Sequence, residues 1–239
     1  MRTTRITLGG VMKKIVAAAC AVTFGLLAAC AGSRGPVEYS DDGLLRMPSR
    51  AEGGVYRLED WPYSQYKQVI VEPLVVSFIK DWEKNHREVP AKEVKRIREE
   101  MQTMFREQLT KELVTRGKYK IADAPGHDVL LLEPRCEDLD IVAPDANTMD
   151  TKTLAPGPPK MKLVTEMRDS VTGTLVGRVI MFSGQENYSF EQLRIANRVT
   201  NAHDIGLAFT GYTQLLRETL NVARTSRPKS DLPHAEAPK

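Results

Sequence analysis

The chain has 239 residues, and 34 lysines and arginines stand against 31 aspartates and glutamates, which gives a formal net charge of +3. Four of the basic residues and none of the acidic ones lie in the first 29 residues, so the rest of the chain carries 30 against 31, a net charge of about −1. A balance this close to neutral gives no support for a nucleic-acid partner, which needs a clustered basic face.

The first 29 residues have the three-part layout of a secretory signal peptide. Lys13 and Lys14 are followed by fifteen mostly apolar residues and then by small ones. The apolar stretch is too short to cross a hydrocarbon core of about 30 Å, which takes about 20 residues. The run Leu27-Ala28-Ala29-Cys30 resembles the lipobox of bacterial lipoproteins. This resemblance implies that the sulfur of Cys30 carries a diacylglyceryl group and that Cys30 is the first residue of the mature chain.

The cleavage site and the first methionine have alternatives. The run Ala29-Cys30-Ala31 also fits the small-x-small pattern of an ordinary signal peptide, with cleavage before Gly32. Cys20 follows small residues too, but only five residues separate it from Lys14, fewer than the roughly 7 to 15 of an apolar region, so we interpret it as part of the leader. Met12 is an alternative start to Met1.

The anchor predicts where the protein is found. In bacterial lipoproteins an aspartate directly after the lipidated cysteine is typical of retention in the inner membrane. The residue at this position is Ala31, so by this resemblance we expect the outer membrane, with the domain facing the periplasm. An inner-membrane anchor and a soluble periplasmic protein are the alternatives. Beyond the leader, Cys136 is the only cysteine besides Cys30, so no intrachain disulfide is available once Cys30 is lipidated. Its apolar neighbourhood predicts a buried thiol.

Composition divides the rest of the chain into a domain and two tails. Residues 30–59 are rich in Gly, Ser, Arg and acidic residues, and we predict a flexible tether there. Residues 60–224 are expected to form a single domain. Residues 225–239 hold three prolines and one large apolar residue, which predicts a disordered tail.

Within 60–224 the apolar periodicity alternates between strand and helix. We predict a buried strand in 66–79 interrupted at Pro73, a helix from Pro90 to Gly117, strands at 119–122 and 128–142, a loop over 143–160, a hairpin of strands 161–168 and 174–182, and a helix over 202–223. This order predicts an α+β fold, with a mixed or antiparallel sheet of about five strands and two long helices packed on one face.

Three segments resemble a known family. Tyr66 to Leu74, Val129 to Pro134 with Leu139-Asp140, and the turn Asp169-Ser170-Val171-Thr172-Gly173 look like the bacterial lipoprotein family called domain of unknown function three-three-one-three. The resemblance covers roughly residues 39–224. It implies a lipoprotein of the bacterial envelope, and it implies no catalytic residues because the family has no established activity.

No residue pattern predicts a metal or cofactor site. The histidines at 86, 127, 203 and 234 share no short ligand spacing with each other or with Cys136, and Ser170 does not lie in a Gly-x-Ser-x-Gly motif. The acidic residues Asp138, Asp140, Asp145 and Asp150, with Asn147, lack the Gly and distal Glu of a calcium loop, so a solvated strand end is favoured. Glu137 and Asp138 are neighbours on a strand and are expected to point to opposite faces.

We therefore expect no enzyme, no catalytic residues, no metal and no cofactor, and Cys30 as the lipidation site. The function favoured by the sequence is a lipid-anchored accessory module that binds an envelope protein during transport or assembly. The alternative is an envelope hydrolase or ligand-binding enzyme with dispersed residues. A deep pocket that gathers His127, Asp138, Asp140 or Arg135 would favour this alternative, whereas a shallow surface would favour binding.

Overall fold

The computed structural model describes residues 38–142, 153–184 and 193–226. In chain order the strands are β1 (Leu45–Met47), β2 (Gly54–Arg57), β3 (Gln68–Val71), β4 (Val75–Phe78), β5 (Lys120–Ile121), β6 (Val129–Asp140), β7 (Thr153–Ala155), β8 (Lys160–Asp169), β9 (Leu175–Ser183) and β10 (Arg194–Ala196). The α-helices are α1 (Trp82–Asn85), α2 (Ala91–Lys111) and α3 (Arg198–Thr225), with a 3₁₀ turn, η1 (Tyr63–Gln65), and a π turn, η2 (Glu112–Arg116).

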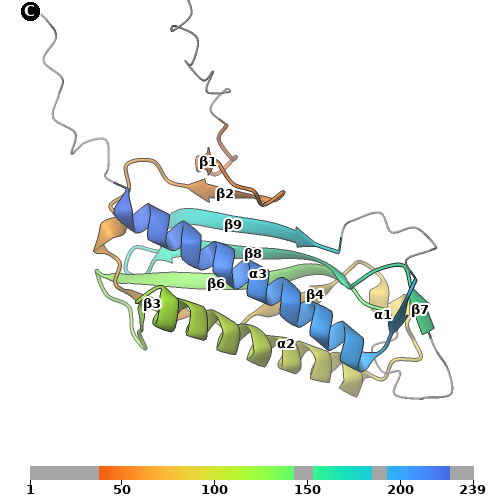
Figure 1. Cartoon of the computed structure of the whole chain (residues 1–239). Helices are drawn as coiled ribbons and strands as arrows, with labels where there is room; N and C mark the ends of the chain where they lie inside the picture. Colours follow the sequence, from red (N-terminus) through yellow and green to blue (C-terminus); the bar gives the residue numbers. More distant parts are fainter. Residues whose placement is uncertain (1–37, 143–152, 185–192, 227–239) are drawn as a thin grey trace, which may run out of the picture. The chain divides into compact units, whose positions relative to one another are not determined.

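The described strands form one large sheet and one small one. The large sheet has eight strands in the order β1-β2-β9-β8-β6-β3-β5, and β4 pairs with β6 beyond β3. Strands β3 and β4 run parallel to β6, and β8 runs antiparallel to it. Figure 1 shows α2 and α3 on the same face of this sheet. The α+β class with two long helices and a mixed sheet is confirmed, but the expected number of about five strands is wrong.

Two errors account for most of the missing strands. The run from 66 to 79 forms β3 and β4, because the chain passes Pro73 between them and Pro73 has no N–H for a ladder bond. Both strands then pair with the same edge of β6, one after the other. The prediction of a flexible tether over 30–59 is also wrong for residues 38–59, since β1 and β2 lie there and β2 pairs with β9.

The helices bury one apolar stripe each against the sheet. In α2 the stripe consists of Val94, Ile97, Met101, Phe105 and Leu109, all of them buried, as the spacing predicts. Helix α3 begins four residues earlier than predicted, because the Asn197 side chain accepts bonds from the backbone N–H groups of Val199 and Thr200 and caps the helix. No helix in the described ranges is long and apolar enough to span a membrane.

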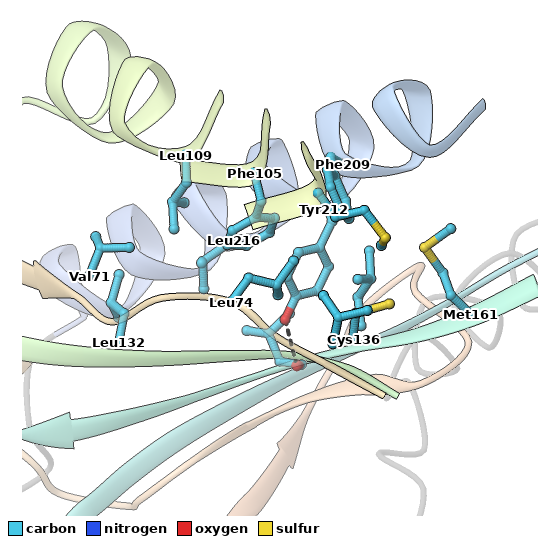
Figure 2. Close-up of a cluster of buried hydrophobic side chains, with 14 of the residues drawn as sticks. Val71, Leu74, Phe105, Leu109, Leu132, Cys136, Met161, Phe209, Tyr212 and Leu216 are labelled. Atoms are coloured by element: carbon cyan, nitrogen blue, oxygen red, sulfur yellow. Dashed lines mark hydrogen bonds between the residues drawn. The ribbon is translucent and has the colours of Figure 1, made fainter. Parts of the chain in front are cut away.

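The two helices meet over the middle of the sheet. The rings of Phe105 on α2 and Phe209 on α3 pack edge to face with centroids 5.2 Å apart, and both side chains are almost fully buried. Figure 2 shows this cluster above β6, with Cys136 beneath it. Cys136 is completely buried, which confirms its prediction, and burial raises the pKa of its thiol to about 12.

The hairpin between β8 and β9 forms where the sequence predicts it. The Asp169 carboxylate accepts hydrogen bonds from the backbone N–H groups of Val171 and Thr172, at 3.2 and 2.8 Å, and from the Tyr66 hydroxyl at 2.8 Å. Gly173 adopts a φ of 71°, which a side chain would disfavour. The turn that carries the family resemblance therefore has a structural role, which is to join β8 to β9 and tie them to the start of β3.

Several predicted segments lie outside the described residues or at their limits. The signal peptide (1–29), Cys30 and residues 227–239 of the predicted tail fall outside the described ranges, whereas 225 and 226 close α3. The predicted loop over 143–160 is wrong at 153–155, because these residues form β7, which pairs with β10 in the small sheet. Lys160 already belongs to β8.

Candidate functional site: the open face of the sheet

The sheet has one face covered by α2 and α3, and we call the other the open face. Side chains alternate along a strand, so Leu132 and Cys136 of β6 enter the core, while Glu133, Arg135 and Glu137 point to the open face. Glu166 of β8 lies beside Arg135 in the middle of this face. The open face therefore carries charged residues over the centre of the sheet.

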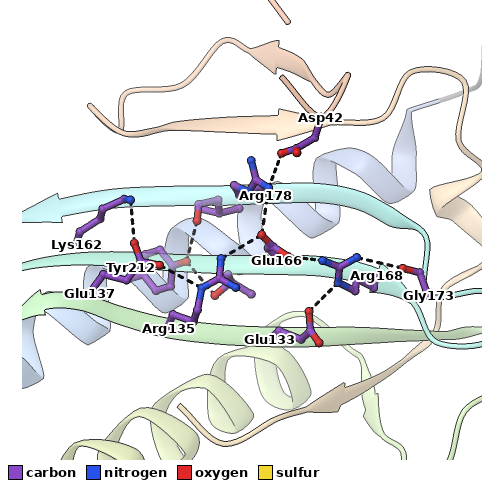
Figure 3. A network of polar contacts seen from close by, with 12 residues as sticks. Asp42, Glu133, Arg135, Glu137, Lys162, Glu166, Arg168, Gly173, Arg178 and Tyr212 are labelled. Carbon is purple, nitrogen blue, oxygen red and sulfur yellow. Dashed lines mark hydrogen bonds and ion pairs between the residues drawn. The ribbon is translucent and has the colours of Figure 1, made fainter. Parts of the chain in front are cut away.

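These charges form one network around Glu166, whose side chain is only 9% exposed. Its carboxylate accepts hydrogen bonds from the guanidinium groups of Arg135 at 3.0 Å, Arg168 at 2.5 Å and Arg178 at 3.1 Å. Figure 3 shows the three guanidinium groups converging on it from β6, β8 and β9. Burial opposes ionisation of Glu166, but the hydrogen bonds from Arg135 and Arg168 outweigh it, so the pKa of Glu166 lies below its usual range.

Further pairs extend the network in both directions. Glu133 pairs with Arg168 at 2.8 Å, and Glu137 pairs with Lys162 at 2.8 Å. On the other side Asp42, which precedes β1, pairs with Arg178 at 2.6 Å. The network thus joins three central strands to a segment that the sequence assigned to the tether. Because each of these charges has a partner on another strand or segment, the network holds the strands together.

A depression lies at the end of the open face, next to this network. It has a volume of about 700 Å³, is open to solvent, and is lined by Glu52, Ile79, Asp138, Asp140, Lys160, Lys162 and Phe182. Its apolar side chains are Ile79 and Phe182, which are 42% and 40% exposed. The lining therefore combines two exposed apolar groups with charges of both signs.

A β-bulge places Asp138 in this lining. The register between β6 and β8 shifts between Glu137 and Asp140, and Asp138 has a φ of 55°, in the left-handed region. Asp138 lines the same depression as Lys162, the partner of Glu137, so the expectation that Glu137 and Asp138 point to opposite faces is wrong at this bulge. Strict alternation holds only for a regular strand.

The other predicted candidates are dispersed. Asp138 is exposed at the end of β6, as a solvated strand end predicts, whereas residues 145, 147 and 150 of the acidic run lie outside the described residues. The His86 ring stacks on Trp82, and Ser170 hydrogen-bonds with the backbone of Gly126. The described residues contain no group of three His, Cys, Asp or Glu side chains arranged to hold a metal ion.

The depression brings together only part of the residue set that would favour an enzyme. It contains Asp138 and Asp140 but neither His127 nor Arg135, and it is open to solvent. His127 lies just before the start of β6, whereas Asp138 and Asp140 lie at the other end of this 12-residue strand. The depression offers apolar and charged groups on an accessible surface.

The free edge of β4 borders this depression. Among the described strands β4 pairs only with β6, and the carbonyl oxygen of Leu74, just before it, accepts a hydrogen bond from Gln102 of α2 at 2.9 Å. Val75, at 59% exposure, pairs with Arg135 of the open face, and Ile79 follows four residues later. Sequence reasoning missed this edge because it treated 66–79 as one buried strand, although the alternation Val75, Ser77, Ile79 is typical of a half-exposed one.

Comparisons with solved structures give only distant similarities. The chain resembles a PelC dodecamer from Paraburkholderia phytofirmans at 12% identity, with a TM-score of 0.36, over 71% of this chain and 97% of that one. It also resembles protein XCC0632 from Xanthomonas campestris at 14% identity, with a TM-score of 0.38, over 66% of this chain and 85% of that one. Similarity at this level establishes neither a shared fold nor a shared function. No curated protein sequence matches the chain significantly.

A family model does match, and it covers the structure just described. It spans residues 39–208, which include the large sheet, the Glu166 network, α2 and the first part of α3. Its first residue lies just before β1, in agreement with a folded domain that begins well ahead of residue 60. The match extends over more than half of the sequence, and the chain belongs to the family described as Protein of unknown function (DUF3313).

Proposed function

We propose that this protein is a lipid-anchored envelope module that binds a partner protein and performs no catalytic step. The observation that carries the proposal is the free edge of β4, flanked on the open face by exposed Val75 and Ile79 and next to Phe182 in the depression. An unpaired strand edge offers backbone N–H and C=O groups that an extended segment can pair with, and apolar side chains beside it add affinity.

The partner chemistry follows from this geometry. We propose an extended segment of an envelope protein that adds a strand along β4, with alternate side chains directed to the open face. Apolar side chains of that segment would contact Val75 and Ile79, and a polar or charged one would meet Lys160 and Asp140 in the depression. The helix side of β4 is covered by α2, so such a segment has one face on which to place its side chains.

Crosslinking at defined positions tests this docking surface. A photoreactive amino acid at Val75 or Ile79 of the full chain, in cells, is expected to give a discrete crosslinked product. The same amino acid at Val171, which is 53% exposed on the β8–β9 turn, is expected to give none. In a chain with the crosslinker at Val75, Ile79→Lys should reduce the product about tenfold, because a lysine beside a strand edge blocks pairing, whereas Val171→Lys should not.

Two outcomes would count against the docking surface. Equal products from Val75, Ile79 and Val171 would mean that the crosslinks report only exposure. A product that persists unchanged in Ile79→Lys would mean that the partner binds elsewhere. Thermal unfolding of the variants distinguishes loss of binding from loss of fold, and substitutions at these exposed positions are expected to change stability by less than about 0.5 kcal/mol.

The membrane attachment is a second part of the proposal. We propose that Cys30 is lipidated and holds the protein on the periplasmic side of the outer membrane. Only seven residues separate Cys30 from Glu38, where the described domain begins, so the two lie at most about 28 Å apart. The shortened tether would keep the domain close to the membrane surface instead of far above it.

Fractionation of cells tests the anchor. Cys30→Ser is expected to block processing or release the protein from membranes, because the thiol is the only group at that position that can take the lipid. Separation of inner and outer membranes, together with labelling by a radioactive fatty acid, shows which membrane holds the unsubstituted chain. Membrane association and labelling that are unchanged in Cys30→Ser would refute the lipoprotein proposal, and Cys20→Ser serves as the matched control.

A further inference from the structure

The outer face of α3 carries an unusual set of residues. Val199, Leu207 and Val222 are 75%, 59% and 59% exposed, although α3 is otherwise well packed through its inner face. The side chains that point away from the sheet follow one line along the helix, which we call the outer stripe: Val199, His203, Leu207, Thr210, Gly211, Gln214, Glu218 and Val222. Spacings of three and four residues place them on one side of an α-helix.

The outer stripe has the same spacing when it is followed from either end. Val199 lies 11 residues before Thr210, and Val222 lies 11 residues after Gly211. His203 and Glu218 stand seven residues from these two central positions. A second copy of α3, turned antiparallel about a two-fold axis through the centre, would therefore place each residue opposite its counterpart. This is the self-complementarity that a two-fold symmetric interface requires.

Two of the facing pairs are chemically matched, whereas Leu207 would face Gln214. Val199 would face Val222, two exposed apolar side chains that lose contact with water. His203 would face Glu218, whose side chain is 63% exposed and whose carboxylate accepts from Arg217 of its own helix at 3.0 Å. An imidazole N–H can donate to a carboxylate, and the symmetry makes this contact twice. The stripe thus offers a second copy one apolar contact and one hydrogen-bonding contact, each made twice.

The centre of the stripe is small. A Cβ atom built on Gly211 has no heavy atom within 4 Å, so the helix surface there is open. Glycine in the exposed interior of a helix weakens that helix relative to alanine, and close approach of another backbone is a common reason for its use. A second helix that crosses at Gly211 could approach closely at this point.

We propose that the chain forms a homodimer in which the outer stripes of two α3 helices pack antiparallel about a two-fold axis between Thr210 and Gly211. The helices cover one face of the sheet in each subunit, as Figure 1 shows, so the open face and the edge of β4 lie away from this interface. The interface is narrow, since a single helix contributes it from each side. Attachment of both subunits to one membrane would raise their effective concentration.

Complementary charge substitutions test the dimer. Two full chains with different affinity tags are co-expressed, solubilised in mild detergent and purified through one tag, and the recovery of the second tag is measured. His203→Glu present in both chains places carboxylates opposite each other, and Glu218→Lys in both chains places a lysine opposite the histidine. Each variant is expected to reduce recovery roughly tenfold or more, because His203→Glu opposes two carboxylates twice and Glu218→Lys twice removes the carboxylate that accepts from His203.

The decisive measurement combines the two variants. One chain with His203→Glu and one with Glu218→Lys can pair with opposite charges in contact, so recovery is expected to return close to that of the unsubstituted chain. Leu207→Asp in both chains should also reduce recovery, because it replaces an apolar side chain with a charge that must lose water in the interface. Glu107→Lys, on the exposed surface of α2, is the matched control and should leave recovery unchanged.

Three results would overturn the dimer. The first is an unsubstituted chain that does not recover its differently tagged copy. The second is that two chains with the same single substitution recover each other as well as two unsubstituted chains do. The third is failure of the mixed pair while both variants show unchanged thermal unfolding. If a charge variant unfolds, the recovery of the second tag with Leu207→Asp is compared with the recovery with Glu107→Lys, and equal recoveries would overturn the dimer.

Discussion

Replacing Phe209 with alanine is expected to lower the free energy of unfolding by about 3 to 5 kcal/mol, the range for loss of a buried phenylalanine. Phe209 is fully buried and its ring packs edge to face on Phe105, which joins α3 to α2 above the sheet. The substitution removes this contact and leaves a cavity at the point where both helices meet β6, as Figure 2 shows. The neighbouring side chains come from rigid elements, so the cavity cannot close completely.

Urea unfolding of the purified chain measures this loss. The midpoint should fall for Phe209→Ala, with a smaller fall for Phe209→Leu, because leucine fills part of the space. Leu154→Ala is the matched control: Leu154 is 53% exposed on β7, and its truncation should change stability by less than about 0.5 kcal/mol. Equal effects for Phe209→Ala and Leu154→Ala would mean that α3 does not pack against α2 in the way described.

Elements held by local signals could be predicted from the sequence. Helix α2 follows from the spacing of Val94, Ile97, Met101 and Phe105 alone, and each of these side chains is buried as expected. The hairpin at Asp169 follows from turn residues that hydrogen-bond to their own backbone. In both cases the information lies within a few residues of the chain, so one sequence is enough.

Elements held by distant partners could not be predicted. Strand β2 has only four residues, Gly54–Arg57, and it becomes a strand because β9, more than 100 residues further on, offers an edge to it. Its residue type does not distinguish the buried Glu166 from a glutamate exposed to solvent. Only the folded sheet brings Arg135 and Arg178 to it. The bulge at Asp138 likewise depends on how β6 and β8 pair. The pairing of charges on the open face therefore could not be predicted from the sequence.

Glu166→Gln is expected to lower the free energy of unfolding by about 2 to 3 kcal/mol, because it removes the charge that three guanidinium groups share. The arginine side chains are 19% to 35% exposed, so water compensates for part of the loss. Glu133→Gln is the control: Glu133 is 37% exposed and pairs with Arg168 alone, and its loss should cost less than about 1 kcal/mol. Equal losses for the two variants in urea unfolding would contradict a central role for Glu166.

The same variant should change how stability depends on pH. The pKa of Glu166 is lowered in the folded chain, so its contribution is present above the pKa of an unfolded glutamate, about 4.3, and is lost as the pH falls through the lower folded value. Glutamine does not titrate, so the difference in unfolding free energy between the original chain and Glu166→Gln should be constant above about pH 5.5 and shrink below about pH 4.3. Glu100 and Asp169, whose pKa values are also lowered, share no ion-pair partner with Glu166, are present in both chains and cancel in that difference. A difference that grows as the pH falls would have the wrong sign for an ionised Glu166, and would mean that the three arginines are held by something other than its charge.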